Sequence, residues 1–224
     1  MDVAAPIDPF ADPRNRMVDS QIRPNKVTDP RILGAMRSIP RERFLPPALA
    51  SLAYVDKDVP VGSGRVLMEP MVIARMIQLI APEAGERALV VAAGVGYGAA
   101  VLAACGVRVT ALEADEALLA VARTALAAIA PGVNLVAGPL AAGWPQDAPY
   151  DIVLIEGAVV APPPAIVEQL RKETGRMVTV IRGAAGPGHA VRGEATQAGL
   201  QLWPEFDCAT LPIPALLPPP AFSF

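Results

Sequence analysis

The pattern of hydrophobic and polar positions changes character near residue 81. Before this point, short amphipathic stretches separated by prolines predict helices at residues 17–23 and 29–38, and a stronger amphipathic helix at 71–80. A polar, turn-rich segment at 53–64 lies between the second and the third of these helices. The first 16 residues show no regular pattern and are expected to form a flexible arm.

After residue 81, apolar runs alternate with helical patterns. Strands are predicted at residues 87–92, 107–112, 133–136, 151–155 and 177–181, and helices at 98–104, 114–129 and 164–172. This alternation predicts an α/β fold with a parallel, doubly wound sheet that is covered on both faces. Two later runs, at 200–203 and 208–213, predict an antiparallel hairpin at the sheet edge, and the proline-rich end of the chain cannot extend a helix or a central strand.

One motif in this part suggests a ligand. An uncharged apolar run leads into Gly94 and Gly96, a small-residue helix follows, and Glu113 closes the next predicted strand. This is the layout of a nucleotide-binding βαβ unit, in which glycines let backbone N–H groups approach the ligand and the acid accepts hydrogen bonds from ribose hydroxyls. Two simpler interpretations stay open. The glycines could only allow close packing of a helix on a strand, and Glu113 could join Asp115 and Glu116 as acids favoured at a helix N-terminus.

Composition narrows the function classes. The net charge of −3 and the lack of a basic stripe argue against a nucleic-acid partner. Residues 88–107 are long enough to cross a bilayer, but their glycines and alanines favour a buried strand, turn and helix, and no membrane role is expected. Residues 1–16 carry acids and prolines and do not look like a signal peptide.

The cysteines and the histidine indicate neither a metal site nor a catalytic triad. Cys105 and Cys208 have no metal-ligand spacing and are expected to be buried hydrophobes in a reducing, cytoplasmic compartment, so no metal site is predicted. His189 stands in a glycine-rich loop with no Ser or Cys partner near it in sequence, so a catalytic triad is unsupported.

Seven short stretches follow one another in a recognisable order. They are Met17-Val-Asp-Ser-Gln-Ile22, Ile39-Pro-Arg-Glu-Arg-Phe-Leu-Pro46, Ala53-Tyr54 with Asp56, Pro60-Val-Gly-Ser-Gly64, Glu69-Pro70 with Ala74-Arg75-Met76, Gly94-Val-Gly-Tyr97, and Ala148-Pro-Tyr-Asp151. Together they resemble the protein-L-isoaspartate O-methyltransferase family, over residues 17–214. Each motif is weak when taken separately, and the ordered set is specific.

The resemblance implies a seven-stranded, mostly parallel Rossmann-like methyltransferase sheet at 81–224, preceded by a small helical subdomain with a substrate loop at 17–80. It implies S-adenosylmethionine as cofactor, and methylation of the carboxylate of an isoaspartyl residue in a protein or peptide. The cofactor-binding positions that it implies are Ala92, Ala93, Gly94, Gly96, Glu113, Ala114, Gly138 and Pro139.

The chain also departs from the family at several positions. The family's threonine and catalytic serine are replaced by Val66 and Met68, and small or hydroxyl residues give way to Glu156. Three further positions differ: the acid that ends the first strand is Val90, the first glycine of the turn is Ala92, and the Gly-Asp-Gly after the third strand reads Gly138-Pro139-Leu140.

The departures bear on activity. Methyl transfer to an ionised carboxylate needs no general base, so catalysis depends on positioning and on exclusion of water. Efficient isoaspartyl repair is therefore expected to be absent, and no residue is assigned as catalytic with the serine missing. Repair activity, methylation of a different, less polar acceptor, and a non-catalytic binding or scaffold protein all remain open.

Most of these replacements are apolar, which suggests a further hypothesis. If the apolar side chains lie together, the crevice is either packed shut, with Met68 and Pro139 inside it, or fitted to a less polar ligand. Asp56 and Asp58 are expected to be exposed loop acids near the substrate mouth.

Overall fold

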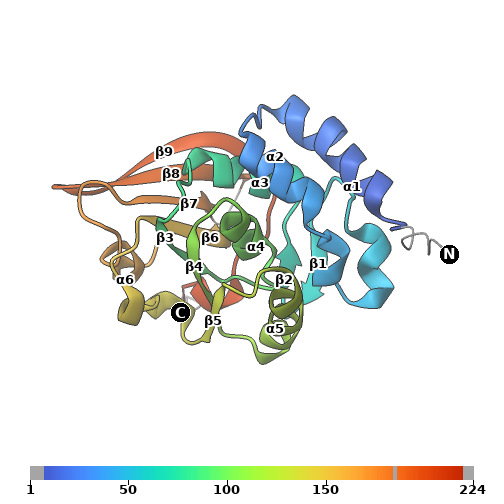
Figure 1. Ribbon diagram of the computed structural model, residues 1–224. Coiled ribbons are helices and arrows are strands. Elements are labelled where there is room, and N and C mark those ends of the chain that lie inside the picture. The colour runs from blue at the N-terminus through green and yellow to red at the C-terminus, as the bar shows by residue number, and fades with distance from the viewer. Residues whose placement is uncertain (1–7, 184–185, 219–224) are drawn as a thin grey trace.

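The computed structural model of the protein describes residues 8–183 and 186–218, and a seven-stranded sheet forms its centre (Figure 1). The strand order is β5-β4-β3-β6-β7-β8-β9. The strands are β3 (Arg87–Val91), β4 (Arg108–Glu113), β5 (Asn134–Ala137), β6 (Ile152–Val159), β7 (Arg176–Ile181), β8 (Gly188–Thr196) and β9 (Gly199–Cys208). The first five in this order are parallel, and β8 pairs antiparallel with both β7 and β9. The predicted doubly wound sheet with an antiparallel edge hairpin is confirmed.

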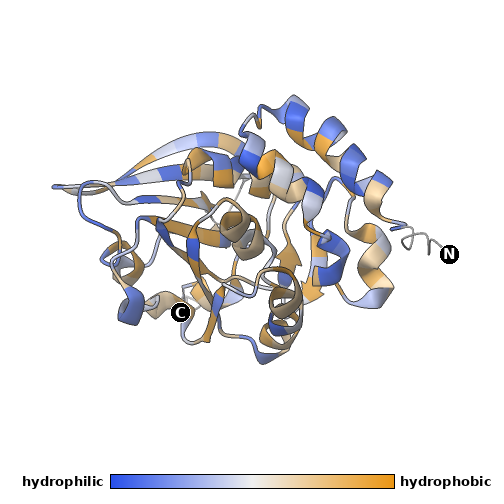
Figure 2. Cartoon of the chain, viewed as in Figure 1, coloured by the Kyte–Doolittle hydropathy of each residue, from blue (hydrophilic) through white to orange (hydrophobic). Residues whose placement is uncertain are grey.

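Helices cover the two faces of the sheet unequally. The helices α3 (Pro70–Leu79), α4 (Tyr97–Ala104) and α5 (Glu116–Ile129) pack on one face. In the described residues the other face carries the short α6 (Pro164–Val167) and the 3-10 turns Leu140–Ala142, Pro145–Asp147 and Pro214–Leu216. The colouring of Figure 2 shows apolar residues concentrated in the central strands, as expected when a parallel sheet is buried on both faces.

The helix α6 is shorter than the predicted 164–172. The chain leaves the helix after Val167 because the following residues pair with the start of β6: the Tyr150 amide donates to the Gln169 carbonyl at 2.8 Å, and the Arg171 amide donates to the Tyr150 carbonyl at 2.7 Å. A local pattern of apolar residues could not reveal this competing backbone pairing.

The edge hairpin is present, but its strands lie elsewhere than predicted. His189 belongs to β8 and not to a loop, and residues 209–213 leave β9 and return to β6, where Pro212 pairs with Ala158. The return places the last described residues across the carboxyl edge of the sheet. Residues 184–185 and 219–224, which the sequence assigned to a loop and to the proline-rich end, lie outside the described ranges.

The N-terminal part is more ordered than expected. The helix α1 (Ala11–Met17) continues through a π turn at Val18–Ile22 and a 3-10 turn at Arg23–Asn25, and α2 (Pro30–Ser38) follows. Arg14 is buried and donates from Nε to the Tyr54 hydroxyl at 2.9 Å. The prediction of a flexible arm is therefore wrong for residues 8–16, because a buried arginine needs these partners. Residues 1–7 are outside the described ranges.

A small two-stranded sheet is the element that the sequence did not predict. The strands β1 (Val59–Gly62) and β2 (Arg65–Leu67) pair antiparallel within the segment expected to be polar turns and its continuation. Ser63 and Gly64 at the tip have positive φ values of 51° and 67°. Ser63 Oγ donates to Asp115 Oδ2 at 2.5 Å, so the tip of this hairpin reaches the connection between β4 and α5.

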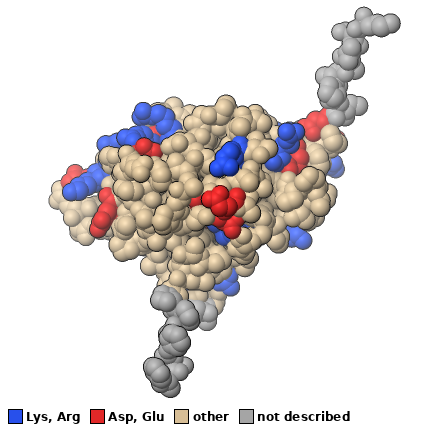
Figure 3. Space-filling view, turned by 90° about the horizontal axis from the view of Figure 1, so that it is seen from below, with Lys and Arg blue, Asp and Glu red and all other residues tan. Residues whose placement is uncertain are grey.

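None of the helices in the described residues is both long and apolar enough to span a membrane. On the face of the molecule shown in Figure 3, acidic and basic side chains form small separate groups among mostly uncharged residues.

Candidate functional site

The strand order reverses between β3 and β6, and the carboxyl ends of β3, β4 and β6 meet there. In open α/β sheets this switch point is where ligands bind. The turn after β3 contains Ala92, Gly94 and Gly96 with φ values of 56°, 57° and 93°. Ala92 thus takes a left-handed conformation that glycine adopts more easily. At Gly96 a Cβ would lie 3.0 Å from the Leu126 side chain, so close packing also requires this glycine.

Glu113 ends β4 beside this turn, with 1% of its surface exposed. Its Oε2 accepts the Gly94 amide at 2.8 Å, and its Oε1 accepts the amides of Ala114 and Asp115 at 2.8 and 3.1 Å. The glycine turn and the acid therefore lie together, as the βαβ layout predicted. Asp115 instead caps α5, because its Oδ1 accepts the Ala117 and Leu118 amides.

Arg65 is the residue that sequence analysis missed. It projects from β2 with 7% exposure, and its Nη1 lies 3.1 Å from Oε2 of Glu113. Its Nη2 donates to the carbonyl oxygens of Ala92 at 2.5 Å and Glu156 at 3.2 Å. One guanidinium thus joins the carboxyl ends of β3, β4 and β6. An arginine directly after a segment predicted as turns usually faces solvent, so nothing local pointed to this role.

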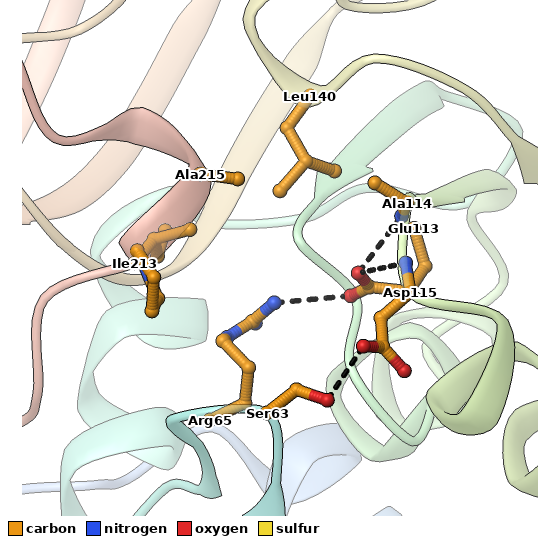
Figure 4. A pocket seen from close by; sticks show the side chains of 9 residues that line it. Ser63, Arg65, Glu113, Ala114, Asp115, Leu140, Ile213 and Ala215 are labelled. Carbon is orange, nitrogen blue, oxygen red and sulfur yellow. Dashed lines mark hydrogen bonds and ion pairs between the residues drawn. The ribbon is translucent and has the colours of Figure 1, made fainter. Parts of the chain in front are cut away.

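A cavity of about 210 Å³ lies next to this ion pair (Figure 4). The hairpin tip, the β4–α5 connection and the C-terminal segment form its walls. The lining residues are Ser63, Arg65, Glu113, Ala114, Asp115, Leu140, Ile213, Pro214 and Ala215. Of the eight expected cofactor positions, only Glu113 and Ala114 line this cavity. Gly138 and Pro139 precede Leu140, which does reach it, and Ala92, Ala93, Gly94 and Gly96 form the adjacent turn.

The position of the family's serine is deep in the protein. Met68 is 2% exposed and belongs to the core cluster on the α3 and α4 side of the sheet, and Val66 packs against the same cluster. The guanidinium of Arg41, which is fully buried, donates to the carbonyl oxygen of Met68, and its Nε donates to the Ala53 carbonyl at 2.7 Å. Arg41 therefore holds the backbone after β2 in place.

Glu156 contributes a second carboxyl group, which is half-buried and whose Oε1 is fully buried. It lies in β6 just after the residues that pair with β3, and its Oε1 takes the space that a Cβ at Gly98 would fill. Burial raises the pKa of Glu156 to about 8, although the positive charges of Arg65 and Arg41 act in the opposite direction. This carboxyl group is therefore mostly protonated at neutral pH.

Three buried side-chain atoms near this carboxyl group have no hydrogen-bond partner: Glu156 Oε1, Arg41 Nη1 and Tyr97 Oη. Arg41 Cζ lies 4.5 Å from the centre of the Tyr97 ring, and Tyr97 directly precedes Gly98. Burial lowers the pKa of Arg41 and raises the pKa of Tyr97. Unpartnered polar atoms in a folded interior indicate a place for water or for a polar group of a ligand.

The hypothesis of a crevice closed by apolar side chains is wrong. Met68 and Val90 belong to one core cluster, Ala92 and Leu140 belong to the cluster on the opposite face, and Pro139 is exposed. They do not form one plug, because the sheet lies between the two clusters and Pro139 lies at the surface. Arg65 occupies the crevice instead.

The remaining candidates lie outside this site or have structural roles. Asp58 is not a free loop acid, since its carboxylate accepts the Glu69 amide at 2.7 Å and the Thr210 hydroxyl at 2.9 Å. His189 pairs with Asp207 across the edge hairpin, and Cys105 and Cys208 are buried free thiols. Within the described ranges, no three His, Cys, Asp or Glu side chains gather as metal ligands would.

Comparison with known proteins agrees with this architecture. The sequence model of the family described as Protein-L-isoaspartate(D-aspartate) O-methyltransferase (PCMT) matches residues 12–189. The Protein-L-isoaspartate O-methyltransferase of Methylorubrum extorquens (strain PA1) is 42% identical over 181 residues, which cover 81% of this chain and 79% of that protein. That of Aeropyrum pernix is 40% identical and covers 78% of this chain and 68% of its own length.

Solved structures show the same fold. A protein-L-isoaspartate O-methyltransferase superposes with a TM-score of 0.78 at 22% identity, over 89% of this chain and 65% of the other. A protein from Plasmodium falciparum, described as a beta-aspartate methyltransferase (PCMT) in complex with S-adenosyl-L-homocysteine, superposes with a TM-score of 0.74 at 15% identity, over 89% and 97% of the two chains. The family match over most of the chain and the shared fold together show that this chain belongs to the protein-L-isoaspartate O-methyltransferase family.

Proposed function

We propose that the protein binds S-adenosylmethionine at the switch-point crevice and transfers its methyl group to a carboxylate of a protein or peptide. The observation that supports this most directly is the meeting of the glycine turn with Glu113 beside a cavity at the carboxyl edge of the sheet. Membership of the family supports both the cofactor and the class of acceptor.

The residues around the cavity fit the nucleoside end of this cofactor. Glu113 would hold the ribose hydroxyls, and Ala114, Asp115 and Leu140 line the space beyond it. Three amide donors keep the Glu113 carboxylate in place, and only the contact with Arg65 has to be exchanged for a hydroxyl group. When bound, the cofactor supplies a methyl group on a sulfonium centre, which is electrophilic without help from the protein.

The other side of the crevice would receive the acceptor. A carboxylate is ionised at neutral pH and needs donors to orient it, not a base. Arg41 and Tyr97 each keep one unpartnered buried donor. Because Glu156 is mostly neutral, it does not repel an incoming carboxylate.

Isoaspartyl groups are expected to be poor acceptors. Val66 and Met68 provide no hydroxyl group at the positions where the family has threonine and serine. Loss of one orienting hydrogen bond lowers a rate by roughly one to two powers of ten. We therefore expect slow isoaspartyl methylation.

A second candidate function is non-catalytic binding on the same fold. The burial of Met68 and the position of Arg65 within the crevice favour it. The two proposals differ in whether the cofactor binds at all.

Calorimetric titration with S-adenosylhomocysteine tests the first proposal. We expect micromolar-range binding, and a weakening of about 10- to 100-fold for Glu113→Gln, which keeps the shape of the side chain and removes its charge. A companion assay follows base-labile methyl esters formed from labelled S-adenosylmethionine on isoaspartyl and ordinary acidic peptides. The absence of any binding at millimolar ligand would overturn this function and leave the binding protein as the better account.

A further inference from the structure

A ligand that binds the Glu113 carboxylate would have to compete with Arg65 for it. Glu113 Oε2 accepts two donors, the Gly94 amide and Arg65 Nη1, and Oε1 accepts two further amides. A ribose hydroxyl can gain this carboxylate only by displacing one of them. The backbone amides are held by the turn and by α5, so the side chain of Arg65 is the contact that can yield (Figure 4).

Displacement would leave the guanidinium without a counter-charge. Arg65 and Glu113 are both almost fully buried, and a buried charge deprived of its partner is strongly unfavourable. The two remaining contacts of Arg65 are neutral carbonyl oxygens, those of Ala92 and Glu156. They keep the guanidinium at the ends of β3 and β6 and do not neutralise it.

The surrounding residues offer no anion that is free of other hydrogen bonds. The Ser63 hydroxyl and the amides of α5 hold the pKa of Asp115 below its usual range, and the charge of Arg65 adds to this effect. The oxygens of this carboxylate are therefore already engaged by the Ser63 hydroxyl and the Ala117 and Leu118 amides, and it is at most a distant counter-charge for Arg65. The carboxyl group of Glu156 points away to Gly98, while only its backbone oxygen contacts Arg65. The other lining residues of the cavity are Ala114, Leu140, Ile213, Pro214 and Ala215, which carry no charge. A new partner for Arg65 must therefore come with the ligand.

We propose that Arg65 is a selectivity residue of the crevice, which exchanges its ion pair with Glu113 for one with a carboxylate of the bound ligand. This inference rests on the proposed cofactor site. Arg65 then distinguishes nucleosides that carry an amino-acid end, such as S-adenosylhomocysteine, from nucleosides that lack a carboxylate, such as 5′-methylthioadenosine. A ligand of the second kind breaks the ion pair and leaves Arg65 unpaired.

The test compares both ligands by calorimetry on the full chain and on Arg65→Gln. We expect the unaltered protein to prefer S-adenosylhomocysteine over 5′-methylthioadenosine by about 100-fold or more. In Arg65→Gln this preference should fall by at least about tenfold, mainly because 5′-methylthioadenosine binds more tightly once Glu113 is free. The control is Arg171→Gln, which removes an exposed ion pair with Asp151 and should leave both affinities unchanged.

The outcomes separate the two proposals. If both proteins bind S-adenosylhomocysteine and the ratio of the affinities is the same, the role of Arg65 is overturned and the cofactor site stands. If Arg65→Gln weakens both ligands equally, Arg65 is part of the binding wall and not a selectivity residue. If neither protein binds either ligand at millimolar concentration, both proposals are overturned. Thermal unfolding of Arg65→Gln checks that it folds, which is expected because three amides still satisfy Glu113.

Discussion

The proposed site has a nucleoside side, around Glu113 and Arg65, and an acceptor side, around Glu156, Arg41 and Tyr97, and the two differ in how completely their polar groups are satisfied. On the nucleoside side, every oxygen of the Glu113 carboxylate has donors, and Arg65 supplies the counter-charge. On the acceptor side, Glu156, Arg41 and Tyr97 each keep a buried atom without a partner, and Met68 fills the serine position. The nucleoside side is thus complete in the free protein, whereas the acceptor side is left with unmet hydrogen-bonding capacity.

This difference suggests separate consequences for ligand binding. A ligand on the nucleoside side must replace an interaction that already exists, so its affinity depends on what it offers Arg65 in return. A ligand on the acceptor side can satisfy atoms that are otherwise unpartnered, and each such contact removes a desolvation cost. The comparison can be tested by removing groups from either side.

The largest effect is expected for Glu113→Ala. The change leaves Arg65 buried without a counter-charge and leaves three amides unpartnered, so the free energy of unfolding should fall by about 3–5 kcal/mol. Urea unfolding measures it. Glu86→Ala, which breaks the half-buried pair with Arg176, is the matched control and should cost about 1 kcal/mol or less. If both variants lower the free energy of unfolding equally, the pair of Glu113 and Arg65 is no more important for stability than the pair of Glu86 and Arg176.

Met68→Ser tests the acceptor side. Replacing a buried methionine by serine should lower the free energy of unfolding by about 2–4 kcal/mol, because it removes core packing and buries a hydroxyl group. Methyl transfer to an isoaspartyl peptide should nevertheless rise by about tenfold if the missing hydroxyl limits the reaction. Met76→Ser, a similarly buried change in α3, should destabilise the protein without raising the rate. A folded Met68→Ser protein with no gain in rate would show that positioning on the acceptor side is not limiting.

The raised pKa of Glu156 predicts that the stability of the protein depends on pH. The pKa of this group is about 8 in the folded protein, compared with an ordinary value of 4.5, so between these values the folded chain holds one more proton than the unfolded chain. The free energy of unfolding should therefore decrease as pH rises from about 4.5 to about 8, by at most about 1.4 kcal/mol per pH unit.

The variant Glu156→Gln isolates this contribution. Its side chain is neutral at all pH values, so the fall in stability across this window should be smaller than in the unaltered protein. The comparison of the two proteins in chemical denaturation at pH 5, 6, 7 and 8, roughly spanning the window, removes the contributions of other groups. Parallel pH profiles would show that Glu156 is ionised in the folded protein.

The smallest change in the free energy of unfolding is expected for a substitution in the turn after β3. Ala92 has a φ of 56°, which a residue with a Cβ adopts only at some cost. Ala92→Gly should therefore raise the free energy of unfolding by up to about 1 kcal/mol. Ala93→Gly is the matched control, because Ala93 does not have a positive φ, and it should destabilise by about 0.5–1 kcal/mol through backbone entropy.

Much of the architecture could be predicted from the sequence. The strands β3 to β7, the helices α3 to α5 and the neighbouring positions of Gly94 and Glu113 follow from apolar periodicity and from the rule that parallel strands end at a common edge. These features depend on interactions between residues close in sequence, and on a sheet geometry that is the same in many proteins. The short strands β1 and β2 were missed because three or four residues give no measurable periodicity.

Only the tertiary structure decided what occupies the crevice. Arg65 and Glu113 are 48 positions apart, and the wall formed by Ile213 and Pro214 comes from a segment about 100 positions further on. An arginine next to a turn has the same local pattern whether it faces solvent or a buried carboxylate. The difference depends on which distant carboxylate the fold places within reach, because a charge is stable inside a protein only when the folded chain brings its partner to it.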